Sequence, residues 1–456
     1  MVGMQSVRNG IWLGVSCFVL WTGAGASGQT LDETIRRALP QTVAYKIEAE
    51  RFAAAKQAIA TARAAGLPDI TLAGSTQTGD GTFDLGPNGE ALFERLSSSL
   101  ESPMPSTGAE GGVLGDFGNA STHQAALTVV QPLFSGFRIK NGKAEARATV
   151  SAAKAQFEAQ RQVIGFDIAR TYMAVLAADA RTQSVAKSQE SLTQRARAAN
   201  VSFEAGRGTR TDLALAEARL AGVRARFADA TAQAAQARNQ YRALVGVTPE
   251  AFVLDETIPV LPGSADEAVA TARQVNPRLK AVEFLADARA AAERSARGQR
   301  APSLQVKGTL SYAENRFFAG DRSENATIAA ELSMPIFKGG TIGASVRRAA
   351  AEAREARFVA TDTARQVEAD VRDAFVQFQA ARIAREATAS AVAAAELAFR
   401  GVSLEQEVGQ RTVLDVLQVE DDLLTARFDN VEAQRAYVLA AYQLRLAMGT
   451  LLVADE

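Results

Sequence analysis

The sequence predicts a mainly α-helical chain with a membrane β portion, built from a duplicated repeat. From the second predicted strand of each half onward, the two halves match at an offset of 203 residues, and each half contains short segments that alternate apolar and polar residues. Each half also has a run of about 65 residues with no proline and almost no glycine, which would form a helix near 100 Å long. Four amphipathic strands cannot span a bilayer alone, because open sheet edges leave backbone groups unpaired in lipid. We therefore predict an oligomeric β-barrel continued by a long helical barrel.

The composition excludes several classes of protein. The chain has 50 Lys+Arg and 51 Asp+Glu in 456 residues, a net charge of -1, so no nucleic-acid partner is expected. One His and one Cys leave no material for a metal cluster, a Cys-His couple or a disulfide framework. A phosphate-binding loop of the Gly-x-x-x-x-Gly-Lys-Ser/Thr kind is missing from the sequence. We expect no metal, no cofactor and no enzyme activity.

Residues 1–28 have the pattern of a secretory signal peptide. Arg8 precedes the apolar run Ile11–Trp21, and Ala24-Gly25-Ala26 has the small-x-small form of a cleavage site. An uncleaved anchor is less favoured, because the run is shorter than the about 20 residues of a membrane-spanning helix. A lipid on Cys17 is also less favoured, since this residue lies inside the apolar run. We expect an exported mature chain without cysteine.

The duplication divides the rest of the chain into a first repeat, residues 29–249, and a second repeat, residues 250–456. At the offset of 203 the matched pairs include proline, glycine and aspartate, which alanine-rich helices do not match by chance: Pro132/Pro335, Gly136/Gly339, Asp167/Asp370, Gly206/Gly409, Asp212/Asp415 and Gly246/Gly449. Upstream of these the offset is 234, as in Pro68/Pro302 and Gly74/Gly308. The first repeat thus carries 31 extra residues within Gly79–Gly118, a Gly/Ser/Pro-rich stretch predicted to be an exposed loop.

Each repeat is predicted to contain the same elements in the same order. The first has helices within 31–65, strands 68–78 and 122–132, and a long helical hairpin 138–246. The second has helices within 264–299, strands 302–313 and 326–335, and a hairpin 341–449. Alternation is clearest in the second repeat, where Leu304, Val306 and Leu310 share one face. Such strands approach the 9 to 11 residues that cross a bilayer as a tilted strand.

The long helices carry two apolar stripes. One has 4-3-4-3 spacing and consists of Ile164, Ile168, Thr171, Val175 and Ala178, matched by Val367, Val371, Ala374, Phe378 and Ala381. The other lies on an adjacent face and consists of Phe166, Ala169, Met173, Leu176 and Ala180. Two stripes predict neighbours on both sides of the helix, and the strand count predicts two to four subunits.

The second hairpin tip resembles the TolC family of outer-membrane channel proteins, most closely its type I secretion members. The resemblance is carried by the segment from Val408 through Gly409-Gln410-Arg411-Thr412 to Leu417 and Glu420. Pro335-Ile336-Phe337-Lys338-Gly339-Gly340 resembles the strand-to-helix junction of that family, and Thr30-Leu31-Asp32-Glu33 its mature N-terminus. The resemblance covers essentially the whole mature chain, including the duplication.

This resemblance implies an assembly and a location. The expected object is a homotrimer whose 12-stranded barrel lies in outer-membrane lipid of a Gram-negative cell and continues as a helical tunnel across the periplasm. The loop within 79–118 would face outside, and the turns at Gly206 and Gly409 would point towards the inner membrane. The expected partners are a periplasmic adaptor and an inner-membrane transporter.

The resemblance also implies residue roles. A periplasmic gate lock would join Arg411 to Thr211 and Asp212, with Gln406 where the family often has a tyrosine. The pore constriction would contain Asp415, followed by Gln418 where related channels often carry a second acid. The adaptor would dock on the hairpin tips, and prolines and glycines would form the strand-to-helix junctions: Gly206, Arg207, Thr209, Gly409, Gln410 and Thr412 for docking, and Pro132, Gly136, Pro335 and Gly339 for the junctions.

Simpler interpretations compete with these roles. Asp212 and Asp415 each follow a threonine by three residues and could serve only to start a helix. Arg411 could be a solvated tip residue. The acidic cluster Glu420-Asp421-Asp422 is interpreted as a solvated helix face, with a position facing the lumen as the alternative.

The leading functional hypothesis is a passive exit duct for type I protein secretion, recruited by an adaptor and an inner-membrane transporter. The alternative is the outer-membrane component of a multidrug or small-molecule efflux pump. A periplasmic coiled-coil adaptor is less favoured, because it predicts one hairpin rather than two tandem copies. The strands and helices do not distinguish protein cargo from small-molecule cargo.

Overall fold

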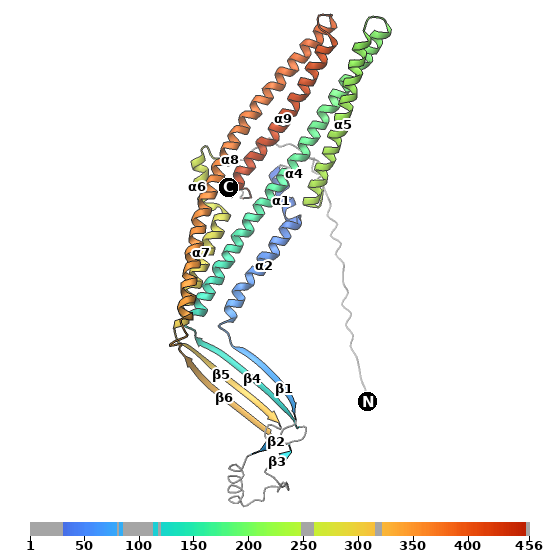
Figure 1. Ribbon diagram of the computed structural model, residues 1–456. Helices are drawn as coiled ribbons and strands as arrows, with labels where there is room; N and C mark the ends of the chain where they lie inside the picture. Colours follow the sequence, from blue (N-terminus) through green and yellow to red (C-terminus); the bar gives the residue numbers. More distant parts are fainter. Residues whose placement is uncertain are drawn as a thin grey trace, which may run out of the picture.

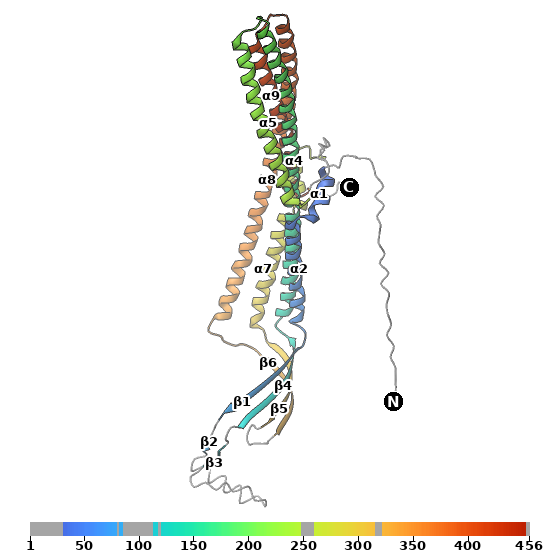
Figure 2. The same cartoon turned by 90° about the vertical axis from the view of Figure 1, so that its right-hand side faces the viewer.

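The computed structural model describes residues 31–79, 82–84, 113–116, 120–247, 260–314 and 322–452. The predicted signal peptide and most of the predicted loop 79–118 lie outside the described residues. The molecule is elongated, with a β-sheet at one end and long helices extending from it (Figures 1 and 2). Both hairpins of long helices run in the same direction and end side by side, far from the sheet.

The described elements follow the predicted duplicated order. The first repeat consists of α1 (Leu31–Ala38), a 3-10 turn (Leu39–Gln41), α2 (Val43–Ala64), β1 (Asp69–Gly79), β4 (Ala120–Phe134), α4 (Arg138–Glu204) and α5 (Arg210–Val245). The second consists of α6 (Ala265–Val275), α7 (Pro277–Arg297), a 3-10 turn (Gly298–Arg300), β5 (Ser303–Glu314), β6 (Arg322–Ser333), α8 (Thr341–Glu407) and α9 (Val413–Met448). Between β1 and β4 in the chain, β2 (Thr82–Asp84) pairs with β3 (Val113–Asp116). The predicted fold class, mainly helical with four membrane-length strands, is confirmed.

The four long strands form one antiparallel sheet in the order β1-β4-β5-β6. Leu72 lies opposite Leu127, and Leu127 lies opposite Leu310, so the apolar residues of successive strands share a face. Thr71, Thr128 and Thr309 line up in the same way on the other face. The sheet therefore has one apolar and one polar side, and β1 and β6 are its edges.

The two prolines predicted to end strands behave differently. β4 continues through Pro132 to Phe134, with a register shift against β5 between these two residues. A proline has no N–H to donate to the ladder, so the strand accommodates it as an irregularity. β6 instead ends at Ser333, before Pro335. The two strands that match in sequence thus have different lengths in the structure.

Helix α4 lies at the centre of the chain and α8 at its edge. α4 packs against α2, α5, α7 and α9, whereas α8 packs against α6, α7 and α9. The predicted seam is buried, with Ile168, Val175 and Val371 fully inaccessible. The largest core cluster surrounds the middle of α4, where Tyr172 meets Tyr241 of α5 edge to face, with ring centroids 6.2 Å apart. The same cluster includes Val438 and Tyr442 of α9, so it joins the second repeat to the first.

Candidate functional site: the hairpin tips and the contact between hairpins

Each hairpin tip is a tight turn built around one glycine with positive φ. Gly206 has φ 69° and Gly409 has φ 80°, a region in which a side chain would be strained. At the first tip, the N–H groups of Arg207 and Gly208 donate to the Ser202 carbonyl at 2.9 and 3.0 Å. At the second tip, the N–H of Gln410 donates to the Glu405 carbonyl at 2.8 Å. These bonds satisfy carbonyls at the end of α4 and α8 and reverse the chain.

The returning helices begin with matching capping boxes. The Asp212 N–H donates to Thr209 Oγ1 at 3.1 Å, and the Thr209 N–H donates to Asp212 Oδ2 at 3.2 Å. Thr412 and Asp415 repeat this arrangement at 3.2 and 2.9 Å. The helix-start interpretation of both aspartates thus matches the structure. The hydrogen bonds from the Thr412 backbone and side chain, and then the nearby Arg411, hold the pKa of Asp415 below its ordinary value.

Within one chain, Arg411 pairs with its own hairpin. Its Nε lies 3.0 Å from Glu405 Oε2, and both side chains are about half exposed. Hydrogen bonding to Glu405 raises the pKa of Arg411, with a smaller contribution from Asp415. Thr211 and Asp212 lie at the other tip and are not partners of Arg411 in the described chain. Arg411 is therefore a charged group at the surface of the second tip, held by one carboxylate.

The two glutamines with expected roles lie on the same hairpin as Arg411. The Gln406 carbonyl accepts the Gly409 N–H at 3.0 Å, so its backbone belongs to the turn. Gln418 is exposed, and its Nε2 donates to Asp422 Oδ1 at 3.2 Å. Asp415 is partly accessible and Gln418 is exposed near the start of α9, about one helical turn further along.

A buried ion pair between the two hairpins was missed by the sequence reasoning. Glu420 of α9 is only 5% exposed, so its interpretation as part of a solvated face is wrong. Arg195 of α4 donates from Nε to Glu420 Oε2 at 3.0 Å and from Nη2 to Ser403 of α8 at 3.2 Å. Burial raises the pKa of Glu420, although Ser191 and Arg195 oppose this effect. A signal was available, since Leu417, Glu420 and Leu424 have the spacing of a buried stripe.

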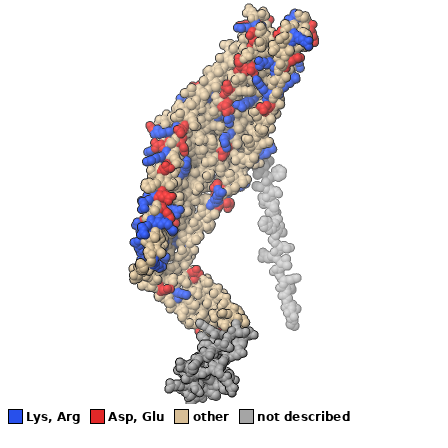
Figure 3. Space-filling view, in the orientation of Figure 1, with Lys and Arg blue, Asp and Glu red and all other residues tan. Residues whose placement is uncertain are grey.

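Other arginines of the first hairpin also reach carboxylates on α9. Arg226 of α5 lies 2.6 Å from Asp421, and Arg219 lies 4.0 Å from the same residue. Arg181 of α4 lies 3.4 Å from Glu432. Charges of both signs are interspersed along these helices (Figure 3). The hairpins are thus joined by an apolar contact flanked by ion pairs, of which Arg195–Glu420 is the most buried.

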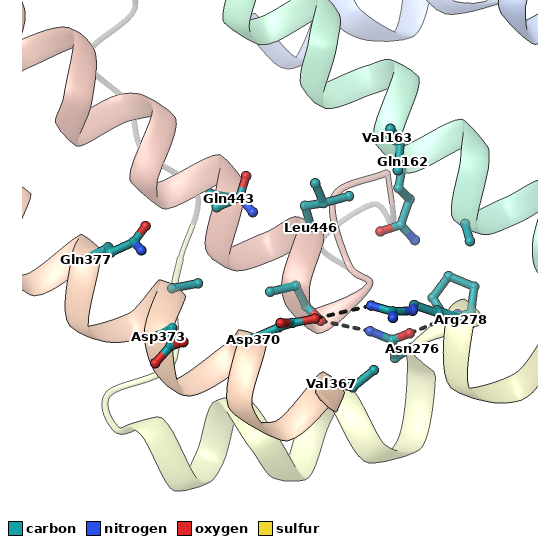
Figure 4. A pocket seen from close by; sticks show the side chains of 14 residues that line it. Gln162, Val163, Asn276, Arg278, Val367, Asp370, Asp373, Gln377, Gln443 and Leu446 are labelled. Atoms are coloured by element: carbon teal, nitrogen blue, oxygen red, sulfur yellow. Dashed lines mark hydrogen bonds and ion pairs between the residues drawn. The ribbon is translucent and has the colours of Figure 1, made fainter. Parts of the chain in front are cut away.

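A cavity of about 460 Å³ lies where α4, α7, α8 and α9 meet (Figure 4). Arg278 of α7 pairs with Asp370 of α8 at 3.2 Å and also donates to Gln366 at 3.0 Å. Asn276 caps α7 and donates from its side chain to the Ala447 carbonyl of α9 at 2.8 Å. These bonds connect the second repeat's short helices to its hairpin.

The strand-to-helix junctions also differ between the repeats. At Gly136, an added Cβ would lie 2.5 Å from the Gly298 carbonyl oxygen, so only glycine fits. The equivalent Gly339, with φ 54°, has open space around it. Pro132 lies within β4, whereas Pro335 lies after the end of β6. The first junction is packed inside the chain, and the second is exposed on its surface.

No group of three or more His, Cys, Asp or Glu side chains in the described residues is placed to hold a metal ion. Among the described helices, none is both long and apolar enough to cross a membrane.

Comparison with known proteins identifies the family. The pattern of the family "Outer membrane efflux protein" matches residues 46–247 and 268–450. The chain is 29% identical over 339 residues to outer membrane efflux protein BepC of Brucella suis biovar 1, covering 74% of each chain. It is 24% identical over 347 residues to the alkaline protease secretion protein AprF of Pseudomonas aeruginosa, covering 73% of this chain and 71% of AprF.

A solved structure shares the fold. The outer membrane protein VceC of Vibrio cholerae superimposes with a TM-score of 0.71 at 21% identity, over 92% of this chain and 96% of VceC. The family match covers both repeats, including the two hairpins and the four long strands. The chain therefore belongs to the outer membrane efflux protein family and is a TolC-like outer-membrane channel protein with a periplasmic extension.

Proposed function

We propose that three copies of this chain form a passive exit duct that spans the outer membrane and the periplasm. The observation that carries the proposal is the open, amphipathic four-stranded sheet. Its edge strand β6 is exposed along its described length, with Ile328 and Leu332 uncovered. Unpaired edges are not tolerated in lipid, and three such sheets give a closed barrel of 12 strands, within the common range.

The helices support the same assembly. α4 and α8 have the same length and match in sequence, yet α4 has fifteen buried residues and α8 has five. Phe358 of α8 is 73% exposed, whereas its repeat equivalent Ala155 of α4 is 8% exposed. A further chain packed against α8 would cover this residue, just as α7 and α9 of the second repeat pack against α4 in addition to the helices of its own repeat.

The hairpin tips would form the closed end of the duct. A three-fold axis would turn Asp415 into a ring of three carboxylates, which favours cations and repels anions. Arg411 would leave or share Glu405 and bond Thr211 and Asp212 of the neighbouring tip, forming the lock. Gln406 replaces a group that would strengthen the lock, and Gln418 replaces a group that would add charge to the ring. We therefore expect a lock of moderate strength and a moderate preference for cations. Opening would be a movement of the hairpins between two arrangements.

Docking at the tips would drive this opening. An adaptor would contact the exposed turn segments Gly206–Thr209 and Gly409–Thr412, and an inner-membrane transporter would supply the energy. The turn residues at both tips are mostly accessible, which suits a docking surface: Gly206, Arg207, Thr209, Gly409, Gln410 and Thr412. The chain itself supplies the conduit and its gate.

The cargo we favour is protein, exported by a type I system. Similarity to AprF, whose name states alkaline protease secretion, supports this choice. The alternative, small-molecule efflux, is supported by similarity to the efflux protein BepC. The helices and strands would serve either cargo equally.

Deletion of the gene from its host tests the cargo. Loss of specific proteins from the medium, with unchanged sensitivity to drugs and detergents, is the expected result. Restoration by the wild-type chain, but not by a variant with Gly409→Val at the docking tip, would link export to this protein. Increased drug sensitivity with a normal set of secreted proteins would overturn protein cargo and favour efflux.

A further inference from the structure

We infer the residue-by-residue register with which β6 of one copy pairs with β1 of the next copy. The inference rests on the proposed oligomeric duct and goes beyond it, because it specifies the contacts of the seam. Its basis is that the chain contains two repeats, so an internal contact between repeats has an equivalent between chains.

The strand pairing within each repeat agrees with the two sequence offsets. β1 maps onto β5 at the offset of 234, and β4 maps onto β6 at the offset of 203. In the first repeat, Asp69 lies opposite Val130. The offsets transfer this pair to Ser303 and Ser333, which do lie opposite each other in the second repeat. The same rule thus reproduces the register of one hairpin from the other.

The seam between chains is the equivalent of the internal β4–β5 pair. β4 maps onto β6, and β5 maps onto β1 of the next copy. The internal pair Leu127–Leu310 therefore transfers to Ala330 and the partner's Thr76. The pair Val129–Gly308 likewise transfers to Leu332 and the partner's Gly74.

This register keeps the two faces of the sheet continuous. Ala330 and Leu332 share their face with Leu304 and Val306 of β5, which is the apolar face. Thr76 and Gly74 share their face with Leu72, the apolar side of β1. A slip of one residue would place polar side chains on the apolar face, so the realistic alternatives are slips of two residues.

The same transfer explains why β6 is shorter than β4. Gln131, Pro132 and Phe134 pair with β5 inside the chain, and their equivalents Met334, Pro335 and Phe337 lie beyond the end of β6. Ile336 and Phe337 are 91% and 85% exposed. Pairing with the next copy would extend β6 to Phe337. The open junction at Gly339 would then face the partner's α2 end, as Gly136 faces Gly298.

Disulfide cross-linking tests the register in the full-length chain. The background variant is Cys17→Ser, which removes the only cysteine of the sequence. Ala330→Cys with Thr76→Cys places two thiols directly opposite across the seam, within the about 4.4 to 6.8 Å that a disulfide needs between Cα atoms. Inside one chain, β1 and β6 are three strand spacings apart, about 14 Å, so they cannot form this bond.

The matched controls keep Ala330→Cys and move the second cysteine by two residues, to Thr78→Cys or Gly74→Cys. These positions lie diagonally at about 7 to 8 Å and should cross-link at least several-fold less. The expected result is covalent dimers and trimers in non-reducing gels for the Thr76 variant, in outer membranes oxidised by copper phenanthroline. Each single-cysteine variant should remain in the outer-membrane fraction without cross-linking through this seam.

The outcomes separate the register from the assembly. Two results would overturn the register and leave the trimer intact. One is stronger cross-linking through Thr78→Cys or Gly74→Cys than through Thr76→Cys, and the other is no cross-linking in a protein that sediments as a trimer. Absence of cross-linking in a protein that sediments as a monomer would overturn the proposed duct and with it the seam.

Discussion

At the scale of single residues, the most informative side chain is Glu420, which lies in the apolar contact between the hairpins. Its neighbours Leu417 and Leu424 are almost fully buried, and Arg195 is its charged partner. Burying a charge costs free energy that the partner only partly offsets. Such a pair contributes little net stability, yet removing one of its two members is strongly destabilising because the other charge is left buried and unpaired. It therefore holds the hairpins in one alignment.

Replacing Arg195 should destabilise the hairpin contact. Arg195→Ala leaves Glu420 buried beside apolar residues, and we expect a loss of about 3 kcal/mol in the free energy of unfolding. Arg197→Ala is the control, because Arg197 is exposed two residues further along α4, and it should change stability by less than about 0.5 kcal/mol. Denaturant unfolding followed by circular dichroism measures both. Equal losses of stability in the two variants would show that the ion pair between Arg195 and Glu420 does not stabilise the contact between the hairpins.

The stability of this contact should depend on pH through Glu420. Because burial raises the pKa of Glu420, the folded state holds a proton on this carboxyl up to a higher pH than the unfolded state does. Stability from this residue is therefore greatest below the ordinary glutamate range and falls as the pH rises through the raised pKa. Glu420→Gln should remove this dependence. The Tm of wild type minus that of the variant should decrease between pH 4 and pH 8, and an increase would contradict this account.

At the scale of elements, the turn glycines set the direction of the hairpins. Gly409→Ala places a side chain at φ 80° and should destabilise the tip by about 1 kcal/mol. Gly401→Ala is the matched control, since Gly401 lies inside α8 with open space around it. There the same substitution should stabilise by about 1 kcal/mol through helix propensity. Hydrogen exchange of the tip amides measures the change in local stability in both variants. An equal change in both would refute the role of the positive φ at Gly409.

Most of the elements were predictable because their signals are local. Period-2 alternation predicted the strands, and proline-free runs with glycine turns predicted the hairpins. The course of β4 through Pro132 was not predictable, because it depends on whether β5 lies alongside to continue the ladder. Glu420 was misjudged for a related reason. Its two acidic neighbours suggested a solvated face, and only the packing of α4 against α9 shows which face is covered.

At the scale of the whole molecule, the duplication explains which helices and strands are packed within one chain and which are left exposed. Contacts from the first repeat to the second are made inside the chain, as between α4 and α9. The equivalent contacts from the second repeat to a following first repeat have no partner within one chain, which leaves α8 and β6 exposed. The sequence predicted this need for neighbours from the strand count. The number three came from family resemblance, since four strands per chain also suit two or four copies.

Single-channel conductance of purified protein in planar lipid bilayers tests directly whether copies of this chain enclose one passage that is closed at the hairpin tips. The wild type should give small, uniform steps. Arg411→Ala and Asp212→Asn should each give larger steps, because each removes one side of the lock. Glu405→Gln should not enlarge them, since it only frees Arg411 for its neighbour. Conductance steps of unchanged size in the Arg411 and Asp212 variants would overturn the assignment of the lock. The absence of any steps from folded protein would contradict the duct itself.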